Sequence, residues 1–197
     1  MKIIDVIQQS DEWFKLRKGK ISGSHAQAIG NCGKGLDTYI IETMSEYFSS
    51  GEKERFSNQH TDRGNELEAQ ARAIYELETG SKVEQVGLVE YNDYVVCSPD
   101  GLVGEDGGIE IKCVDDKSYL KLLLDGETDT SYIWQIQMNM LITERKWFDL
   151  VIYNPNFEKS ISIYRLLPNQ EMREKLLKGF NIAEEKIKLI IIKMKNL

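Results

Sequence analysis

The chain has 197 residues, 41% of them hydrophobic, and its 25 Lys and Arg against 32 Asp and Glu leave a net charge of −7 at pH 7. This length supplies one domain with a core of its own, and the composition excludes a disordered chain, collagen and a coiled coil. The 3 cysteines are an odd number and widely spaced, which favours neither a disulfide framework nor a cysteine-cage metal site. We therefore expect a reducing compartment, the cytoplasm.

No membrane segment is expected. The opening MKIIDVIQQ meets Asp5 after two isoleucines and lacks the apolar stretch of a signal peptide. The longest late apolar run ends at Lys193 and is far shorter than the roughly 18 residues of a spanning helix. The acidic total argues against loose, sequence-independent coating of DNA, but it leaves room for a locally basic site.

The first third of the chain is expected to be helical. Ser10 can cap a helix that Gly19 ends, and Asp37 can cap another. Residues 49–62 are polar and predict a loop. The expected helices cover residues 11–19, a short segment after residue 24, residues 37–49 and residues 63–79.

Beyond Gly80 the sequence alternates β-branched residues with tight turns, which is typical of strands. We expect a small antiparallel meander, then helices and two further strands. The expected strands cover residues 83–91, 94–104, 108–114, 147–153 and 160–166, and the expected helices cover 117–124, 131–141 and a last segment from 169. This order indicates an α/β or mixed α+β fold in a single domain over residues 1–197, with a central mixed sheet flanked by helices.

Two carboxylates and a lysine form the main candidate site. In a strand, Glu110 and Lys112 share one face, and a hairpin centred near residue 105 brings Asp100 opposite Glu110. Opposed like charges are destabilising unless a cation neutralises them, and Mg²⁺ or Mn²⁺ prefers such oxygen ligands. With Lys112 beside them, this pattern indicates phosphodiester hydrolysis. The alternative is a solvent-exposed hairpin with charged outer residues.

Two helices add candidate polar residues. On the helix over 63–79, Glu68 lies on the same face as Arg72 and Tyr75, so it either reaches a metal at the hairpin or forms a surface ion pair with Arg72. On the helix over 131–141, Gln137 falls inside the apolar arc, whereas Gln135 and Asn139 fall on the polar side. Gln137 is therefore either a hydrogen-bond hub in the core or a member of the site.

The N-terminal region contains a candidate phosphate pocket. Arg17 supplies a guanidinium fork, and Ser22 and Ser24 precede the second short helix, whose amides can also face an anion. Ordinary helix capping by these serines is the alternative.

Six segments stand in a characteristic order over about residues 10–155: WFKLRKGKISGS, RGNELEAQAR, SPDG, GIEIKC, YIWQIQMNM and VIYNP. Together they resemble the YqaJ-like viral recombinase (phage lambda exonuclease) family of PD-(D/E)XK nucleases, whose core is restriction-endonuclease-like. The resemblance implies a role for each of eight residues, as metal ligands (Glu68, Asp100, Glu110 and the Ile111 carbonyl), as catalytic residues (Asp100, Glu110, Lys112 and the supporting Gln137) and as contacts to a DNA 5′-phosphate (Arg17 and Ser24).

The resemblance also implies an activity. Family members use Mg²⁺, for which Mn²⁺ substitutes, to degrade one strand of linear double-stranded DNA from 5′ to 3′. The resulting 3′ overhang serves a single-strand annealing partner, and the enzyme forms a homo-oligomer, a ring-shaped trimer. The stretch over residues 49–62 has no counterpart motif in the family. An endonuclease on the same fold and a non-catalytic DNA-binding module are the competing interpretations.

Overall fold

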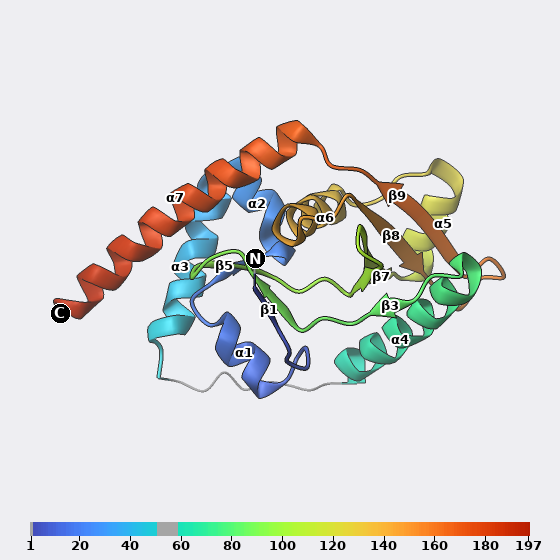
Figure 1. Ribbon diagram of the computed structural model, residues 1–197, viewed down its shortest axis with the longest axis horizontal. Helices are drawn as coiled ribbons and strands as arrows, with labels where there is room; N and C mark the ends of the chain where they lie inside the picture. The colour runs from blue at the N-terminus through green and yellow to red at the C-terminus, as the bar shows by residue number, and fades with distance from the viewer. Residues whose placement is uncertain (1, 51–58) are drawn as a thin grey trace.

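The computed structural model describes residues 2–50 and 59–197, with the backbone alone for residues 59–63. Two sheets and their covering helices make up the described chain (Figure 1). The elements are β1 (Lys2–Ile4), α1 (Asp11–Arg17), β2 (Ile21–Ser22), the 3₁₀ turn η1 (Gly23–His25), α2 (Ala26–Asn31), α3 (Lys34–Phe48), α4 (Gln59–Thr79), β3 (Val83–Glu84), β4 (Leu88–Glu90), β5 (Val95–Cys97), β6 (Gly101–Val103), β7 (Gly107–Cys113), α5 (Asp116–Asp125), α6 (Thr130–Thr143), β8 (Trp147–Tyr153), β9 (Ile161–Leu166) and α7 (Gln170–Lys195).

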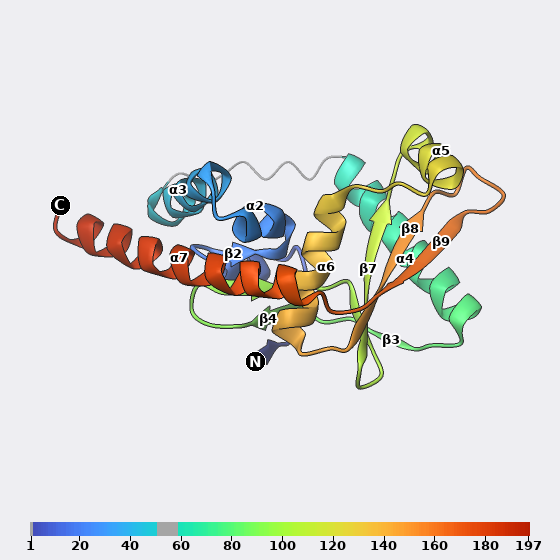
Figure 2. The ribbon, with the colours of Figure 1, turned by 90° about the horizontal axis from the view of Figure 1, so that it is seen from above.

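The larger sheet has the strand order β3-β6-β7-β8-β9, in which β7 and β8 are parallel and the other neighbours are antiparallel. Side chains alternate between its faces. Ile109, Ile111 and Val151 pack with α4, whereas Leu150 and Ile152 pack with α5 and α6 on the opposite face. The strand β7 is thus buried between helical layers (Figure 2).

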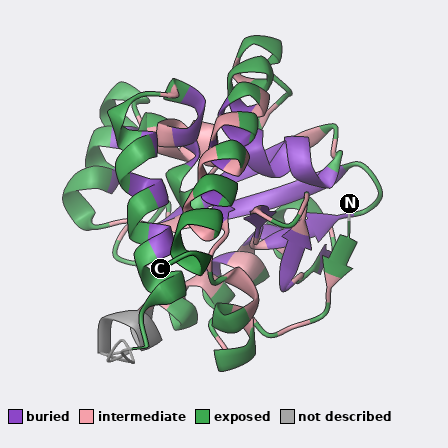
Figure 3. Ribbon diagram, turned by 90° about the vertical axis from the view of Figure 1, so that its left-hand side faces the viewer, coloured by how far each residue is buried: buried purple, intermediate pink, exposed green. Residues whose placement is uncertain are grey.

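The smaller sheet has the order β1-β4-β5-β2 and holds a second core. Helices α2, α3 and α7 cover it, and α7 runs along α2 and α3 (Figure 2). The apolar side of α7 is buried at Leu176, Phe180, Ala183 and Ile187. The central strands and the inner helix faces are buried, whereas β1 and the outer helix faces are exposed (Figure 3), which is the pattern that amphipathic helices predict.

The predicted mixed α/β class is confirmed, whereas the single antiparallel meander is wrong. The strands of that region divide between the two sheets, because the chain leaves β5 and enters β6 across residues 98–100. Helix α3 begins at Lys34 instead of Asp37, since Cys32 in the left-handed conformation (φ 53°) and the cap Gly33 join it closely to α2. Of the predicted loop over 49–62, residues 51–58 lie outside the described residues and 59–62 belong to α4.

Among the described residues, no helix has both the length and the apolar composition required to cross a bilayer.

Candidate active site

The crossing from one sheet to the other positions the first carboxylate. In the β6–β7 hairpin, Gly101 pairs with Ile109, and continuing this antiparallel register by one residue puts Asp100 opposite Glu110, as the sequence predicted. The hairpin is held closely against β8, since a Cβ on Gly108 would come within 2.3 Å of the Phe148 ring. The glycine at 108 therefore allows β7 to lie directly against β8.

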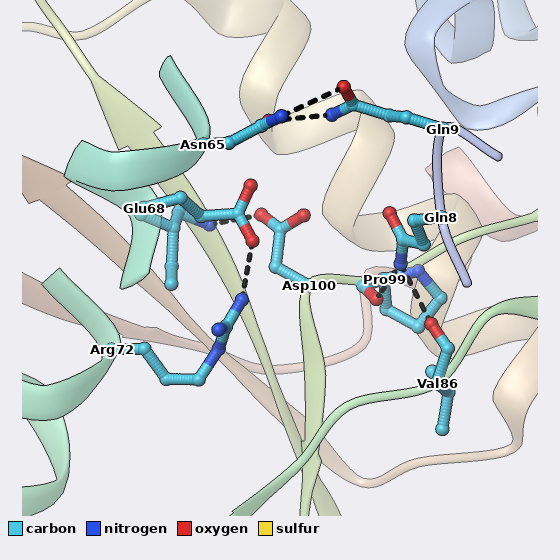
Figure 4. A network of polar contacts seen from close by, with 9 residues as sticks. Gln8, Gln9, Asn65, Glu68, Arg72, Val86, Pro99 and Asp100 are labelled. Carbon is cyan, nitrogen blue, oxygen red and sulfur yellow. Dashed lines mark hydrogen bonds and ion pairs between the residues drawn. The ribbon is translucent and has the colours of Figure 1, made fainter. Parts of the chain in front are cut away.

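Asp100 and Glu68 face each other across the edge of the sheet (Figure 4). Asp100 Oδ2 accepts the backbone N–H of Ile111 at 2.6 Å, and Glu68 accepts a hydrogen bond from Arg72. The carbonyl and the N–H of one strand residue point to the same side of the strand, so the Ile111 carbonyl is directed toward this edge as well. Glu68, Asp100 and Ile111 thus converge as predicted.

A turn before α1 borders these carboxylates (Figure 4). Gln8 Nε2 donates to the carbonyl oxygens of Val86 at 2.7 Å and Pro99 at 3.0 Å, next to Asp100 in the chain. The side-chain amides of Gln9 and Asn65 bond each other in both directions, at 2.9 and 3.2 Å. The turn therefore links the segment that carries Asp100 to the helix that carries Glu68.

Glu110 is 1% exposed, and all of its described partners are donors. Its Oε1 accepts from Lys112 Nζ at 2.8 Å and from the amide of Gln135, and its Oε2 accepts from Asn139 Nδ2 at 2.8 Å. Lys112 Nζ also donates to Gln135 Oε1 at 3.0 Å and lies 5.3 Å from the centre of the Tyr132 ring. Helix α6 therefore fixes both the carboxylate and the lysine.

The pKa values of the site reflect three carboxylates crowded in a poorly solvated place. Burial raises the pKa of Glu110 to about 8, and the Asp100 charge adds to this. Burial also raises the pKa of Asp100, and burial together with the Asp100 charge raises that of Glu68. Burial opposes the charge on Lys112, but the neighbouring Glu110 and Asp100 carboxylates outweigh it and raise the pKa of Lys112. The lysine is consequently protonated at neutral pH.

This donor set fits a divalent cation. Carboxylate and carbonyl oxygens are the ligands that Mg²⁺ and Mn²⁺ prefer, and a cation would relieve the repulsion that raises the carboxylate pKa values. Within residues 2–50 and 64–197, whose side chains the structure describes, no three acidic, histidine or cysteine side chains are already grouped as a metal cage. The fit therefore rests on Asp100 and Glu110 with the Ile111 carbonyl, and Glu68 stands beside them.

Gln137 does not contact this site. The prediction that its side chain supports the catalytic centre is therefore wrong. Its Nε2 donates to the Leu167 carbonyl at 2.9 Å and its Oε1 accepts the Asn169 N–H at 2.8 Å, so it is a hub that joins α6 to the segment before α7. Gln135 and Asn139, which the sequence placed on an ordinary polar face, contact Glu110 instead. The signal available in the sequence was the i, i+4 spacing of Gln135 and Asn139, which places both amides on one side of a helix that has little other polar surface.

The residues of the predicted N-terminal phosphate pocket lie together around Arg17. Arg17 stacks 4.1 Å from the Trp13 ring centre, donates to Ser22 Oγ at 2.7 Å and reaches Ser98 Oγ at 3.4 Å. Ser24 is exposed and its Oγ lies 3.5 Å from that of Ser22. Sequence reasoning identified Arg17, Ser22 and Ser24 but missed Trp13, four residues before Arg17, and Ser98, two residues before Asp100.

A cleft of about 640 Å³ opens on the other side of the site, at the carboxyl ends of the parallel strands β7 and β8. Gly64, Cys113, Lys117 and Asn156 are among its lining residues. Ligands of α/β proteins commonly bind beyond the carboxyl ends of parallel strands. Cys113, which lines the cleft, directly follows Lys112 in β7, so the cleft adjoins the strand that carries the lysine.

The chain is similar to known nucleases. Residues 12–146 match the model of the YqaJ-like viral recombinase domain. The structure resembles an alkaline exonuclease, LHK-Exo, from Laribacter hongkongensis, with 29% identity, 95% of this chain and 99% of that chain covered, and a TM-score of 0.80; a complex of LHK-Exo with dAMP matches equally well. A phage-related exonuclease from Haemophilus somnus 129PT shares the fold at 18% identity, with 89% and 96% covered and a TM-score of 0.63. No curated protein matches.

Proposed function

The chain belongs to the YqaJ-like viral recombinase domain family, and from this membership and the site we propose that it is a Mg²⁺-dependent exonuclease acting on linear double-stranded DNA. The observation that carries the proposal is the convergence of Glu68, Asp100, Glu110 and Lys112 beside the Arg17 pocket. The resemblance to the alkaline exonuclease LHK-Exo over 99% of that chain supports it.

In this proposal Asp100, Glu110 and the Ile111 carbonyl hold the cation, and Glu68 completes its surroundings. A divalent cation at this place supplies Lewis-acid stabilisation of the scissile phosphate, and Mn²⁺ can replace Mg²⁺. Asp100 is kept in position by the Ile111 N–H, and Glu110 by donors from β7 and α6. The carboxylates thus need little rearrangement when they bind.

Lys112 acts as a cation at the reacting phosphate. Its raised pKa keeps the ammonium protonated, so it stabilises the negative charge that grows on the phosphate oxygens and orients the attacking water. Gln135 bridges Lys112 and Glu110 and so positions both. Asn139 holds the second oxygen of Glu110 from the same helix.

Arg17, with Ser22, Ser24 and Ser98, binds the terminal 5′-phosphate. A guanidinium and hydroxyl groups are donors suited to a phosphate monoester, and an enzyme that cuts internally has no need of such a pocket. Holding the 5′ end at this pocket makes the enzyme degrade the strand from 5′ to 3′. The remaining duplex then extends toward the cleft at the ends of β7 and β8.

The family membership supports a place in recombination. We propose that the enzyme leaves 3′ overhangs for a single-strand annealing partner, and that it works as a ring-shaped homotrimer in the cytoplasm. A ring that encloses the duplex would retain DNA despite the net charge of −7. The cysteines at 32, 97 and 113 are free, which suits a reducing compartment.

The testing experiment compares one plasmid in closed circular form and linearised with 5′-phosphate ends, each incubated with Mg²⁺ or with EDTA. We expect loss of the linear form alone, and only with Mg²⁺. Cutting of the circle would replace the proposal by an endonuclease. Absence of digestion with Mg²⁺ and with Mn²⁺, in a folded protein, would favour a DNA-binding module.

A further inference from the structure

His25 stands directly beside the hydroxyl that we assign to the 5′-phosphate. Its Nδ1 lies 3.1 Å from Ser24 Oγ. Its ring stacks on the Tyr39 ring with the centres 3.8 Å apart and the planes at 10°. Tyr39 is fixed in turn, because its hydroxyl accepts the Ser22 N–H at 3.0 Å. The imidazole is thus held in one orientation, with a ring nitrogen facing Ser24.

The protonation state of this ring decides what the Ser24 hydroxyl can do. A serine hydroxyl has one proton to donate. When the neutral imidazole carries its proton on Nε2, Nδ1 accepts and the Ser24 proton is directed at His25. When both ring nitrogens are protonated, Nδ1 donates to Ser24 Oγ, and the hydroxyl proton is free for an anion.

We propose that His25 is a specificity-determining residue that couples recognition of a 5′-terminal phosphate monoester to the uptake of one proton. The inference rests on the phosphate pocket of the proposed function. Protonation of His25 both frees the Ser24 donor and adds a positive charge beside the phosphate.

The surroundings of His25 hold it neutral in the free protein. Burial lowers the pKa of His25 below its usual value, the Glu42 carboxylate of α3 opposes this, and the Arg17 guanidinium of α1 adds to the lowering. Tyr39 is the further titratable group that faces the ring. A bound phosphate brings negative charge next to the imidazole and favours its protonated form, so the phosphate and the proton bind together.

The first experiment measures the dissociation constants of a labelled duplex with a 5′-phosphate and of the same duplex with a 5′-hydroxyl, in EDTA, from pH 6 to pH 8.5. The compared proteins are the wild type, His25→Gln and His25→Phe; the phenylalanine keeps a ring to stack on Tyr39 and removes the nitrogens. For the wild type we expect the preference for the phosphate to fall about tenfold as the pH rises. For both variants we expect a preference that does not fall.

The terminal phosphate itself titrates near pH 6. Its negative charge grows as the pH rises, which is the opposite of the expected fall in preference, and this change is the same for every protein variant. Glu42→Gln provides a matched test, because loss of that carboxylate should move the wild-type transition to lower pH. Calorimetry at pH 7 in buffers of different ionisation enthalpy should show proton uptake with the 5′-phosphate duplex, and less uptake in His25→Gln.

The outcomes separate this inference from the function on which it rests. A phosphate preference that falls with pH in the wild type and not in the His25 variants supports the proposal. A preference with the same pH dependence in all proteins overturns the role of His25 and leaves the pocket standing. No preference at any pH overturns the 5′-phosphate pocket, and the role of His25 with it.

Discussion

Replacing Glu110 by glutamine is expected to stabilise the metal-free protein at high pH while it abolishes hydrolysis. The pKa of Glu110 rises from 4.5 to about 8 on folding, so folding favours the protonated acid. Its stabilising contribution is complete below pH 4.5 and is lost as the pH rises through 8. At about 1.4 kcal/mol per pH unit, this loss is on the order of 5 kcal/mol.

Glu110→Gln avoids this loss, since the amide stays neutral at every pH. It does place an NH₂ group among the donors of Lys112, Gln135 and Asn139, which costs about 1–3 kcal/mol. The buried Asn139 Oδ1, which has no partner in the described structure, can accept from this group if the Asn139 amide turns over. We therefore expect the variant to be about 2–4 kcal/mol more stable than the wild type above pH 8.

Urea unfolding in EDTA from pH 5 to pH 9, followed by tryptophan fluorescence, measures this difference. The variant should be the less stable protein near pH 5, where its amide cost dominates, and the more stable one at pH 9, and added Mg²⁺ should restore stability to the wild type alone. Glu90→Gln is the matched control, and its effect on stability should have the opposite sign. The hydrogen bond from Lys20 lowers the pKa of Glu90, so the ionised Glu90 stabilises the fold above its usual pKa and its replacement should be destabilising there. A wild-type stability that does not fall between pH 5 and pH 9, or a variant less stable at pH 9, would refute the reasoning.

Four further substitutions separate catalysis, end recognition and packing. Lys112→Ala should lower turnover on linear duplex DNA by about 10²–10⁴-fold with an unchanged circular dichroism spectrum, and a rate within tenfold of the wild type would remove the lysine from the mechanism. Arg17→Ala should erase the rate advantage of 5′-phosphate over 5′-hydroxyl ends, whereas equal losses on both substrates would argue against the pocket. Gln135→Ala should reduce turnover with little effect on melting temperature, while Gln137→Ala should cost about 1–3 kcal/mol of unfolding free energy because it leaves the Asn169 N–H unpaired. The reverse pattern for the two glutamines would return Gln137 to the active site.

Local patterns predicted most helices and the hairpin that carries the carboxylates. The spacing of Asp100 and Glu110 about a glycine-rich turn gave the observed register, because a short hairpin leaves few alternatives. The division of the strands into two sheets was not predictable in this way. It depends on pairings that are not between consecutive strands. β5 pairs with β2, which lies much earlier in the chain, and β6 pairs with β3 across the intervening β4 and β5.

The error over α6 has a physical cause. A helical wheel separates apolar from polar residues, but it does not distinguish a face turned to solvent from a face turned to a buried charged group. Every residue from 136 to 143 of α6 is buried. The polar residue Asn139 is therefore buried against Glu110, and its neighbour Gln135 reaches both Glu110 and Lys112. Gln137 was correctly seen as an amide among apolar side chains, but its partners lie in a loop that the sequence does not connect to α6.

From the proposed sites, the short crossing between the sheets is expected to set the size of the product. Ser98 contacts Arg17 of the proposed phosphate site, and Asp100 is a proposed metal ligand, so Pro99 alone separates the two proposed sites in the chain. Two residues of extended chain span about 6.6 Å, which is comparable with the separation of successive phosphates along one DNA strand. A 5′-phosphate held at Arg17 thus places the next phosphate at the carboxylates. We expect mononucleotides as the first products from 5′-labelled duplex, resolved by thin-layer chromatography; dinucleotides as first products would mean that the terminal phosphate binds elsewhere.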